Sequence, residues 1–355
     1  MSKPMKNETR LMQLPGLADV HVHLRVPGGE LKEDYLTGSA AALAGGFTSL
    51  MAMPNTTPPI ITLQDWQAAQ KKANAESLCD VALFAGASTK YIEGLPELGC
   101  YAPALKLYMD LTYGELRVDG LDNLARIAQL WPHEKVLALH AEGDSVKTGI
   151  DLAAKFHRRV HFCHISRKEE IEWIAAAKKQ GLSVTCEVTP HHLFLNEDDA
   201  KRLGPLGDMR PRLAKQSDVN ALWAHINSTI DCVASDHAPH TLSEKQDCEN
   251  PPPGVPGLES TLPLMLTAAA EGRLSYERLV ILLAVNPRRI YGLPAQQDTW
   301  VEVDPRASYS FPDHDLYTKS GWSPFSGFPV QGRIQKVVLR GKEVVRDGIV
   351  LDYLR

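Results

Sequence analysis

The stretch that most constrains the fold of this chain is residues 19–25, which read DVHVHLR. It ends an apolar run that begins at Leu14. Side chains alternate between the two faces of an extended strand, so every second residue shares a face. One face would carry the apolar residues of the stretch, and the other would carry Asp19, His21, His23 and Arg25. Two histidines spaced in this way can bind one zinc ion, because neutral imidazole is a common zinc ligand.

Further apolar runs of strand length follow and alternate with helix-like segments, which is typical of a parallel α/β fold. Eight such strands within about 250 residues match the size of a (β/α)8 barrel of the TIM type. A doubly wound sheet is the alternative, but no glycine-rich phosphate-binding sequence follows the first strand. The expected strands are residues 17–24, 48–53, 80–85, 104–108, 136–140, 160–164, 183–188 and 230–235. The expected helices include residues 63–75, 120–130, 168–179 and 218–226.

The end of the chain has a different pattern. Residues 301–303 and 333–339 alternate in the manner of half-buried strands, and residues 341–348 resemble a hairpin with its turn near Asp347 and Gly348. We therefore expect a barrel over residues 14–298. A small β appendage built from the chain ends would occupy residues 299–355 and pack on the barrel.

The composition narrows the class of protein. A hydrophobic fraction of 44% and a charged fraction of 23% are ordinary for a soluble globular protein. The net charge of −5 and the lack of a basic stripe argue against nucleic acid or an acidic membrane as a partner. The chain has neither an apolar span of about 18 residues nor an apolar signal-peptide core in its first residues. Its six cysteines form no CxxC pair, so we expect a cytoplasmic protein in a reducing environment.

Polar residues recur where the expected strands end. The active sites of such barrels form at the C-terminal ends of the strands. Chance would rarely place so many ligand-type side chains at one end. A metal site is therefore a better interpretation of the two histidines after the first strand than a pair of satisfied polar residues. The recurring residues are His21, His23, Asn55, Lys106, His140, Cys163, His164, Glu187, Asp236, His237 and His240.

Each of the later positions has a structural alternative. Lys106 could extend to solvent, but inside a barrel mouth its desolvated amine could instead react with carbon dioxide to give a carbamate that bridges two cations. His140 and His164 could be core histidines that hydrogen bond the backbone. Asp236 could cap a helix, although its position beside two histidines favours metal binding and proton transfer.

Several motifs together carry a family resemblance over about residues 14–351. The chain resembles dihydroorotases of the amidohydrolase superfamily. It is most similar to the dihydroorotase domain of the multifunctional animal pyrimidine-synthesis protein. The motifs are residues 19–25, 53–56 (MPNT), 106–108 (KLY), 140–142 (HAE), 163–164 (CH), 186–188 (CEV), 190–193 (PHHL), 210–211 (RP), 234–240 (ASDHAPH) and 286–288 (NPR).

The resemblance implies a binuclear zinc site. One zinc would be held by the first histidine pair and the other by the second, with carboxylated Lys106 and a hydroxide bridging them. Asp236 would act as general base and then as general acid. The implied ligands are His21, His23, Lys106, His140, His164 and Asp236. Cys163 and Glu187, together with His140, leave open a third zinc.

The implied reaction is the reversible cyclisation of N-carbamoyl-L-aspartate to L-dihydroorotate in pyrimidine biosynthesis. The substrate carries a carboxylate outside the reacting ring, and a guanidinium can pair with it through two hydrogen bonds. Residues 110–114 resemble the mobile active-site loop of the family, which would close over the substrate and exclude water. The implied substrate contacts are Arg25, Asn55, His240, Arg210, Thr112 and Tyr113.

Two other functions stay open. The first is a related hydrolase of cyclic amides, such as a dihydropyrimidinase, a hydantoinase or an allantoinase. The second is a catalytically inactive dihydroorotase-like scaffold domain, although such a domain is expected to lack ligands that this chain retains. The resemblance also implies a homodimer, and a place within a larger multifunctional polypeptide stays open.

Overall fold

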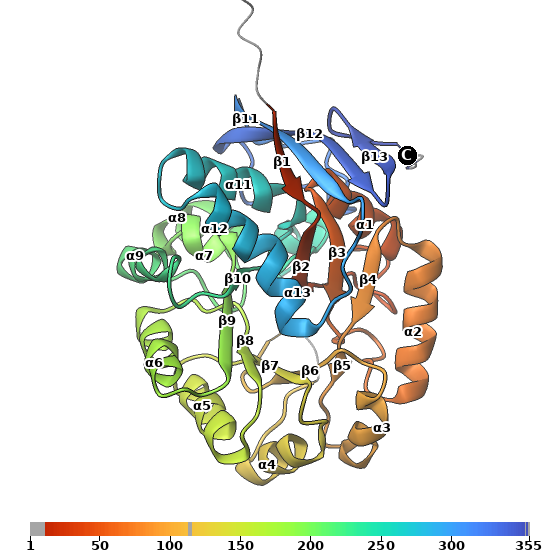
Figure 1. Ribbon diagram of the computed structural model, residues 1–355, viewed down its shortest axis with the longest axis vertical. Helices are drawn as coiled ribbons and strands as arrows, with labels where there is room; N and C mark the ends of the chain where they lie inside the picture. Colours follow the sequence, from red (N-terminus) through yellow and green to blue (C-terminus); the bar gives the residue numbers. More distant parts are fainter. Residues whose placement is uncertain (1–10, 113–115, 352, 354–355) are drawn as a thin grey trace, which may run out of the picture.

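Residues 11–112, 116–351 and 353 are described by the computed structural model. Their central feature is a closed parallel barrel surrounded by helices (Figure 1), as the sequence predicts. The barrel strands are β2 (Leu17–Val22), β3 (Phe47–Ala52), β4 (Asp80–Leu83), β5 (Ala85–Gly86), β6 (Ala104–Tyr108), β7 (Val136–His140), β8 (Val160–Phe162), β9 (Val184–Val188) and β10 (Cys232–Val233).

The barrel closes between its first and last strands. β4 pairs with β3 and β5 pairs with β6, so the two short strands on either side of Phe84 together fill one position of the barrel. Beyond β10, His237 forms a parallel bridge with Val22, and the His23 amide donates a hydrogen bond to the His237 carbonyl oxygen at 2.7 Å. The residues that close the barrel are thus neighbours of the expected metal ligands.

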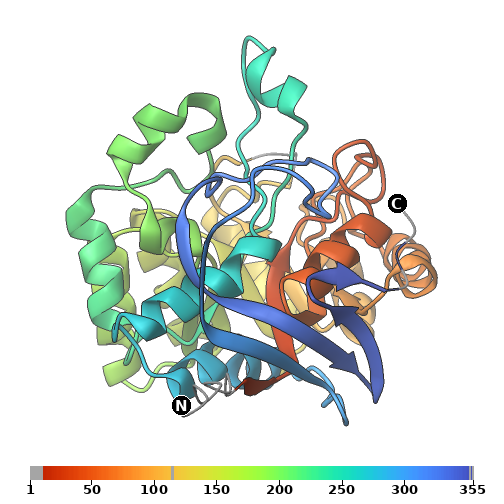
Figure 2. The ribbon, with the colours of Figure 1, turned by 90° about the horizontal axis from the view of Figure 1, so that it is seen from above.

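Helices cover the outside of the barrel (Figures 1 and 2). The four helices named from the sequence are present with ends shifted by at most two residues. The α-helices are α1 (Tyr35–Ala44), α2 (Leu63–Glu76), α3 (Leu95–Gly99), α4 (Leu121–Leu130), α5 (Asp144–Phe156), α6 (Lys168–Lys179), α7 (Pro190–Phe194), α8 (Glu197–Leu203), α9 (Gln216–His225), α10 (Leu242–Gln246), α11 (Leu258–Ala270), α12 (Tyr276–Val280) and α13 (Asn286–Tyr291). Short 3-10 turns lie at Ile92–Gly94 and Gly204–Gly207, and a π-helical turn lies at Ile281–Val285.

The strands alternate between the inside and the outside of the barrel. In β6, Leu105 and Leu107 belong to the core between strands and helices, whereas Ala104 belongs to the core inside the barrel. Most strands contribute one small or apolar residue to this inner core, and Tyr291 of α13 packs edge-on against Phe84, with ring centroids 5.5 Å apart. The inner core thus fills the N-terminal end of the barrel and leaves the other end for polar side chains.

β2 departs from the simple alternation that the sequence predicts. Its pairing with β3 shifts register between Asp19 and Val22. As a result Val20 belongs to the core inside the barrel, whereas Val22 and Leu24 belong to the core outside it. The expectation that these three apolar residues share one face is therefore wrong. An irregularity of this kind re-aims side chains, and here it turns both Val20 and His21 inward.

The two ends of the chain form one antiparallel sheet, the β appendage that the sequence predicts. Its order is β1-β11-β12-β13-β14. α11 packs against β12, and Gly332 (φ 97°) permits the contact, since a Cβ there would lie 2.7 Å from Leu266 Cβ. The boundary expected near residue 298 stays a prediction. The strands are β1 (Met12–Pro15), β11 (Trp300–Ser310), β12 (Pro329–Leu339), β13 (Lys342–Arg346) and β14 (Ile349–Val350).

Among the described residues, the helices are all too short or too polar to cross a membrane.

Candidate active site

A cavity of about 380 Å³ opens at the C-terminal ends of the strands. Strand pairing fixes which residues reach it, since Tyr108 pairs with His140 at the ends of β6 and β7. The lining comes from strands and loops around the barrel and includes most of the residues selected from the sequence. It consists of His21, His23, Arg25, Asn55, Tyr108, Thr112, His140, His164, Arg210, Asp236, Ala238, Pro253 and Gly254.

His21, His23 and Asp236 converge on one point. The Nε2 atoms of His21 and His23 each lie 3.2 Å from Asp236 Oδ1. All three side chains are buried. Their ligand atoms lie close enough together to hold one metal ion, and this nitrogen and carboxylate set suits zinc.

The outer nitrogen of each of these histidines has a fixed partner. His21 Nδ1 lies 2.5 Å from Glu187 Oε1, and His23 Nδ1 lies 2.8 Å from Asn55 Oδ1. Such partners set the orientation of a metal-binding imidazole and leave its other nitrogen free for the metal. Asn55, expected to contact substrate, therefore uses its oxygen to orient His23 while it also lines the cavity.

His140 and His164 form a second pair. His140 Nδ1 faces His164 Nε2 at 2.8 Å, and the His164 ring lies 5.1 Å from the His21 ring, measured between centroids. The buried His164 Nδ1 forms no hydrogen bond with any described residue. The two facing nitrogens, His140 Nδ1 and His164 Nε2, are therefore placed to bind one cation. This cation would lie next to the site formed by the first histidine pair and Asp236.

Lys106 is fully buried and lies next to Tyr108, which lines the cavity. Its Nζ is 2.9 Å from Cys163 Sγ and 5.2 Å from the centroid of the Tyr108 ring. Within the described ranges it forms no ion pair with a carboxylate. A buried ammonium without such a partner is costly, so this environment suits a chemically modified lysine.

A further group of possible metal ligands lies beneath the first. His21, Cys163 and Glu187 place their ligand atoms within 4.8 Å of one another, so the histidine of this group is His21 and not His140 as expected from the sequence. His161 Nε2 lies 3.1 Å from Glu187 Oε2, and His161 Nδ1 lies 2.8 Å from the Thr185 hydroxyl. His161, whose role the sequence leaves ambiguous, thus orients Glu187 from the interior of the barrel.

The backbone is strained at three residues of the site. Arg25 (φ 62°), His164 (φ 35°) and Asp236 (φ 45°) adopt the left-handed conformation that side chains disfavour. Residues held in this way cluster at functional sites, where the surrounding structure keeps them in place. The strain is evidence for function that does not depend on the chemistry of the side chains.

Charge interactions keep the carboxylates of the site ionised. Burial alone would raise the pKa of Asp236, but the charge of His21 and a hydrogen bond with His23 outweigh it and hold this pKa below its ordinary value. Glu187 behaves in the same way, and its pKa falls to about 2 because His21 and His161 outweigh burial. Burial lowers the pKa of His23 to about 4, so this imidazole is neutral near pH 7, as a metal ligand must be.

Cationic side chains gather around His240, beside the part of the cavity that Arg25 lines. Arg25 Nε donates to the Pro239 carbonyl oxygen at 3.1 Å, and Arg25 Nη2 lies 3.1 Å from His240 Nε2. Lys32 Nζ lies 3.3 Å from His240 Nδ1 and 2.7 Å from Glu244 Oε1. His240 lies behind Arg25 and is buried. This side of the cavity suits an anion.

The other expected substrate contacts lie on loops. Arg210 and Thr112 line the cavity, and Arg210 Nη1 contacts Asp208 Oδ1 at 2.5 Å. His192, the second histidine left ambiguous by the sequence, lies 3.0 Å through Nε2 from the Pro211 carbonyl oxygen and so supports the loop of Arg210. Tyr113 lies outside the described residues.

Sequence reasoning did not find the partly buried Lys32 or the buried Glu33 near the site. The carboxylate of Glu33 is fully buried and accepts a hydrogen bond from His237 Nε2 at 3.1 Å. Glu33 belongs to a charged stretch, residues 30–34, that is typical of an exposed loop. The sequence carries no signal for its burial, because its partners are far away along the chain.

Comparisons with known proteins bear on this geometry. A family model described as Dihydro-orotase-like matches residues 10–159. The multifunctional protein CAD of Squalus acanthias is 48% identical over 343 residues, which cover 96% of this chain and 15% of that protein. A dihydroorotase of Methanosarcina acetivorans is 34% identical over 365 residues, with 89% of this chain and 78% of that protein covered.

Solved structures share the fold. An L-hydantoinase (dihydropyrimidinase) from Arthrobacter aurescens has a TM-score of 0.90 at 25% identity and covers 96% of this chain and 87% of its own. An inactive dihydroorotase-like domain of a CAD-like multifunctional protein from Chaetomium thermophilum has a TM-score of 0.82 at 25% identity, with 97% of each chain covered. Structural similarity alone therefore spans active and inactive proteins, and the residues of the site must decide between them.

Proposed function

The chain belongs to the dihydroorotase family, and on that premise we propose that it catalyses the reversible cyclisation of N-carbamoyl-L-aspartate to L-dihydroorotate. One observation carries the proposal: two groups of metal ligands and a cationic wall, formed by Arg25 and Arg210, line a single small cavity. The ligands suit a metal-assisted reaction at an amide-like bond, and the wall suits a substrate carboxylate.

We propose two zinc ions as the metals. The test of fit is the donor set: converging buried imidazole nitrogens and a carboxylate held anionic. His21, His23 and Asp236 would hold one ion, and His140 and His164 the other. When bound, zinc lowers the pKa of a coordinated water to about 7 and polarises a carbonyl group.

Lys106 would bridge the two ions as a carbamate. The ammonium first loses one proton to solvent. The neutral amine then adds to the carbon of carbon dioxide, where one C–O π bond gives way to the new N–C bond, and a second proton leaves to solvent. The product is an anion with two oxygens in place of a buried ammonium that has no carboxylate partner in the described part of the chain. Modification therefore removes an unfavourable buried cation and supplies a ligand to each metal.

Asp236 would transfer the proton. Its depressed pKa keeps it ionised at neutral pH, so it can accept a proton before it donates one. In the hydrolytic direction it accepts the proton of the attacking water and delivers it to the ring nitrogen that leaves. In the biosynthetic direction the same proton moves from the attacking nitrogen to the departing oxygen.

Arg25 would bind the substrate carboxylate that does not react. A guanidinium can donate two parallel hydrogen bonds to a carboxylate, and Arg25 is held in place by Pro239 and His240. Asn55, Arg210 and Thr112 line the same cavity, and we propose that they complete the contact set with His240 and Tyr113. Closure of the loop at residues 110–114 would then exclude water.

A third zinc ion is a further part of the proposal. His21, Cys163 and Glu187 lie in reach of one cation, and a thiolate, an imidazole and a carboxylate all suit zinc. His21 would then contact two metals through its two nitrogens. Zinc content per chain, compared between wild type and Cys163→Ala, tests this site: the variant is expected to bind one zinc fewer, and equal content would contradict it.

The scaffold alternative is disfavoured by the site itself. The expected ligands His21, His23, Lys106, His140, His164 and Asp236 are all retained, and the structure brings them to one end of the barrel. The hydantoinase alternative uses substrates without the extra carboxylate, which leaves the cationic wall unexplained.

Substrate comparison tests the function. Protein supplied with zinc and bicarbonate is expected to hydrolyse L-dihydroorotate much faster than dihydrouracil or hydantoin, and to lose this preference in Arg25→Ala. Faster turnover of dihydrouracil or hydantoin would favour the related hydrolases. No turnover of any of them, with zinc bound, would favour the scaffold.

Three further expectations depend on the family. The chain spans 15% of the multifunctional protein of Squalus acanthias that it matches, and we propose that it acts as one part of such a pyrimidine-synthesis assembly in the cytoplasm. The homodimer stays a prediction, which light scattering of the purified chain would test.

A further inference from the structure

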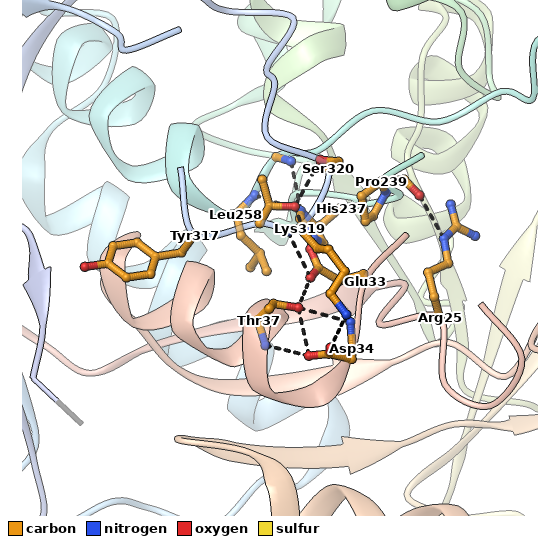
Figure 3. Close-up of polar contacts among 12 residues, drawn as sticks. Arg25, Glu33, Asp34, Thr37, His237, Pro239, Leu258, Tyr317, Lys319 and Ser320 are labelled. Carbon is orange, nitrogen blue, oxygen red and sulfur yellow. Dashed lines mark hydrogen bonds and ion pairs between the residues drawn. The ribbon is translucent and has the colours of Figure 1, made fainter. Parts of the chain in front are cut away.

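A buried carboxylate joins the β appendage to the active site. Glu33 lies in the turn before α1 and is fully buried. Its two oxygens accept hydrogen bonds from His237 Nε2 (3.1 Å), the Thr318 hydroxyl (2.5 Å), the Lys319 amide (3.2 Å) and the Thr37 hydroxyl. Figure 3 shows these contacts meeting at Glu33 from three parts of the chain. Four donors for one carboxylate make a charge-assisted cluster of the strong type.

His237 carries the connection into the site. It directly follows Asp236, and its carbonyl oxygen accepts the hydrogen bond of the His23 amide at 2.7 Å. Its Nδ1 accepts from the Gly257 amide at 3.2 Å. Because a carboxylate accepts and an amide donates, these two partners require the tautomer with hydrogen on Nε2. Glu33 thus fixes the ring, and the ring fixes the backbone next to two expected metal ligands.

The other end of the connection lies in the long segment between β11 and β12. Thr318 donates to Glu33 and lies 3.1 Å from the Ser320 hydroxyl. Further along the same segment, Trp322 Nε1 donates to the His240 carbonyl oxygen at 2.7 Å. Residues 318–322 therefore support His237 through Glu33 and contact His240 directly, although they lie about 80 residues away from both in sequence. The appendage supports the wall of the active site as well as covering the barrel.

We infer that Glu33 is a positioning residue for the reaction: through His237 it holds Asp236 and His23 in place, and Thr318 of the appendage completes its hydrogen bonds. This inference rests on the proposed function for its kinetic readout. Glu33 does not line the cavity, and it contacts none of the residues expected to bind substrate. Its loss should therefore affect turnover and metal binding and leave substrate binding unchanged.

A matched set of variants tests the inference. Glu33→Gln replaces one carboxylate oxygen by an NH2 group, which must then face two of the four donor partners. Thr318→Val removes the hydroxyl, and Thr318→Ser retains it. Thr267→Val is the control, because the Thr267 hydroxyl accepts from the Gln331 amide at 2.8 Å and so joins barrel to appendage far from Glu33. The readouts are kcat, KM, the dissociation constant of zinc and the melting temperature.

Removal of a group that orients metal ligands typically costs about 10- to 100-fold in activity or metal affinity. We expect a loss of this size in kcat and in zinc affinity for Glu33→Gln, and about a tenfold loss for Thr318→Val. KM should change by less than about twofold, since Arg25 is not displaced. Thr318→Ser should behave as wild type, and Thr267→Val should keep wild-type kcat even if its melting temperature falls.

Other outcomes overturn the inference. If Glu33→Gln and Thr318→Val fold with wild-type kcat and zinc affinity, Glu33 does not position the site. If Thr267→Val loses kcat as Thr318→Val does, the effect is one of general stability. Should Glu33→Gln fail to fold, the Thr318→Val and Thr318→Ser pair decides alone. Should wild type not turn over dihydroorotate at all, the proposed function fails, and zinc affinity in the same variants still tests the role of Glu33.

Discussion

The two ends of the barrel interior are built by the same strands and have opposite chemistry. On β6 the inner positions are Ala104 and then Lys106, and on β7 they are Ala138 and then His140. Each pair lies two residues apart and so shares a face. One residue joins the apolar inner core, and the other reaches the cavity. The position along a strand therefore decides whether an inward side chain serves stability or chemistry.

The inward-pointing side chains form two layers. The lower layer, which includes Ala104 and Ala138, belongs to the apolar inner core, and the upper layer, which includes Lys106 and His140, lies toward the active site. The two layers should respond differently to mutation. The lower layer is apolar and close-packed, so truncation of one of its side chains should reduce the free energy of unfolding. The upper layer consists of buried polar groups that are costly to fold without a ligand. Substitutions there should affect turnover, metal content or substrate binding much more than the stability of the chain.

The largest effect is expected at Asp236, in the upper layer. Asp236→Asn keeps the shape of the side chain and removes the group that accepts the proton, so kcat should fall by about 10³-fold or more. The other zinc ligands remain, and zinc content should stay close to that of wild type. Steady-state kinetics together with metal analysis checks both. Substantial turnover in this variant would rule out the proton-transfer role.

The lower layer is tested at Phe84, which packs against Tyr291 at the closed end of the barrel. Phe84→Ala should lower the free energy of unfolding by about 3–5 kcal/mol, because it leaves a cavity in a tightly packed interior. The folded fraction should keep wild-type kcat and KM. Urea unfolding measures the loss of stability. A marked fall in kcat without loss of stability would erase the distinction between the two layers.

Removal of the metals tests how strongly the buried polar groups of the upper layer destabilise the fold when no ligand is bound. A ligand whose free concentration is 100 times its dissociation constant stabilises the folded state by about 2.7 kcal/mol. Chelation should therefore lower the melting temperature and abolish turnover, and added zinc should restore both. If the melting temperature is the same with and without zinc, the upper layer does not depend on metal for its stability.

A smaller effect is expected on the cationic wall. Arg25→Ala should raise KM about tenfold or more, since a charge-assisted hydrogen bond to a carboxylate contributes about 1.5–3 kcal/mol. The change in kcat should be much smaller than in Asp236→Asn. Kinetics over a wide range of dihydroorotate concentrations separates the two parameters. An unchanged KM would count against the assignment of the substrate carboxylate to Arg25.

Periodicity along the chain was sufficient to predict the barrel. Near-continuous apolar runs marked most of the barrel strands, because a strand covered on both faces has little room for polar residues. The same reasoning failed at Val20 and Val22, where pairing with the neighbouring strand shifts register. A register shift depends on contacts with another segment, and a single strand sequence does not contain them.

The candidate site divides in a similar way. His21 and His140 were found because they occupy strand ends, which are predictable from the local sequence. Asn55 was assigned to the substrate, yet its oxygen contacts His23. Glu33 was missed because its partners, His237 and Thr318, are more than 200 residues away along the chain. The groups that touch the reaction were predictable, whereas those that hold them in place depend on tertiary contacts.

The most direct test of the central claim is a crystal structure of zinc- and bicarbonate-supplied protein with anomalous data collected at the zinc edge. We predict one peak between His21, His23 and Asp236, a second between His140 and His164, and carboxylate density extending from the Lys106 amine to both. The proposed third zinc would add a peak beside Cys163 and Glu187. A cavity without anomalous peaks, and an unmodified amine at Lys106, would contradict the account.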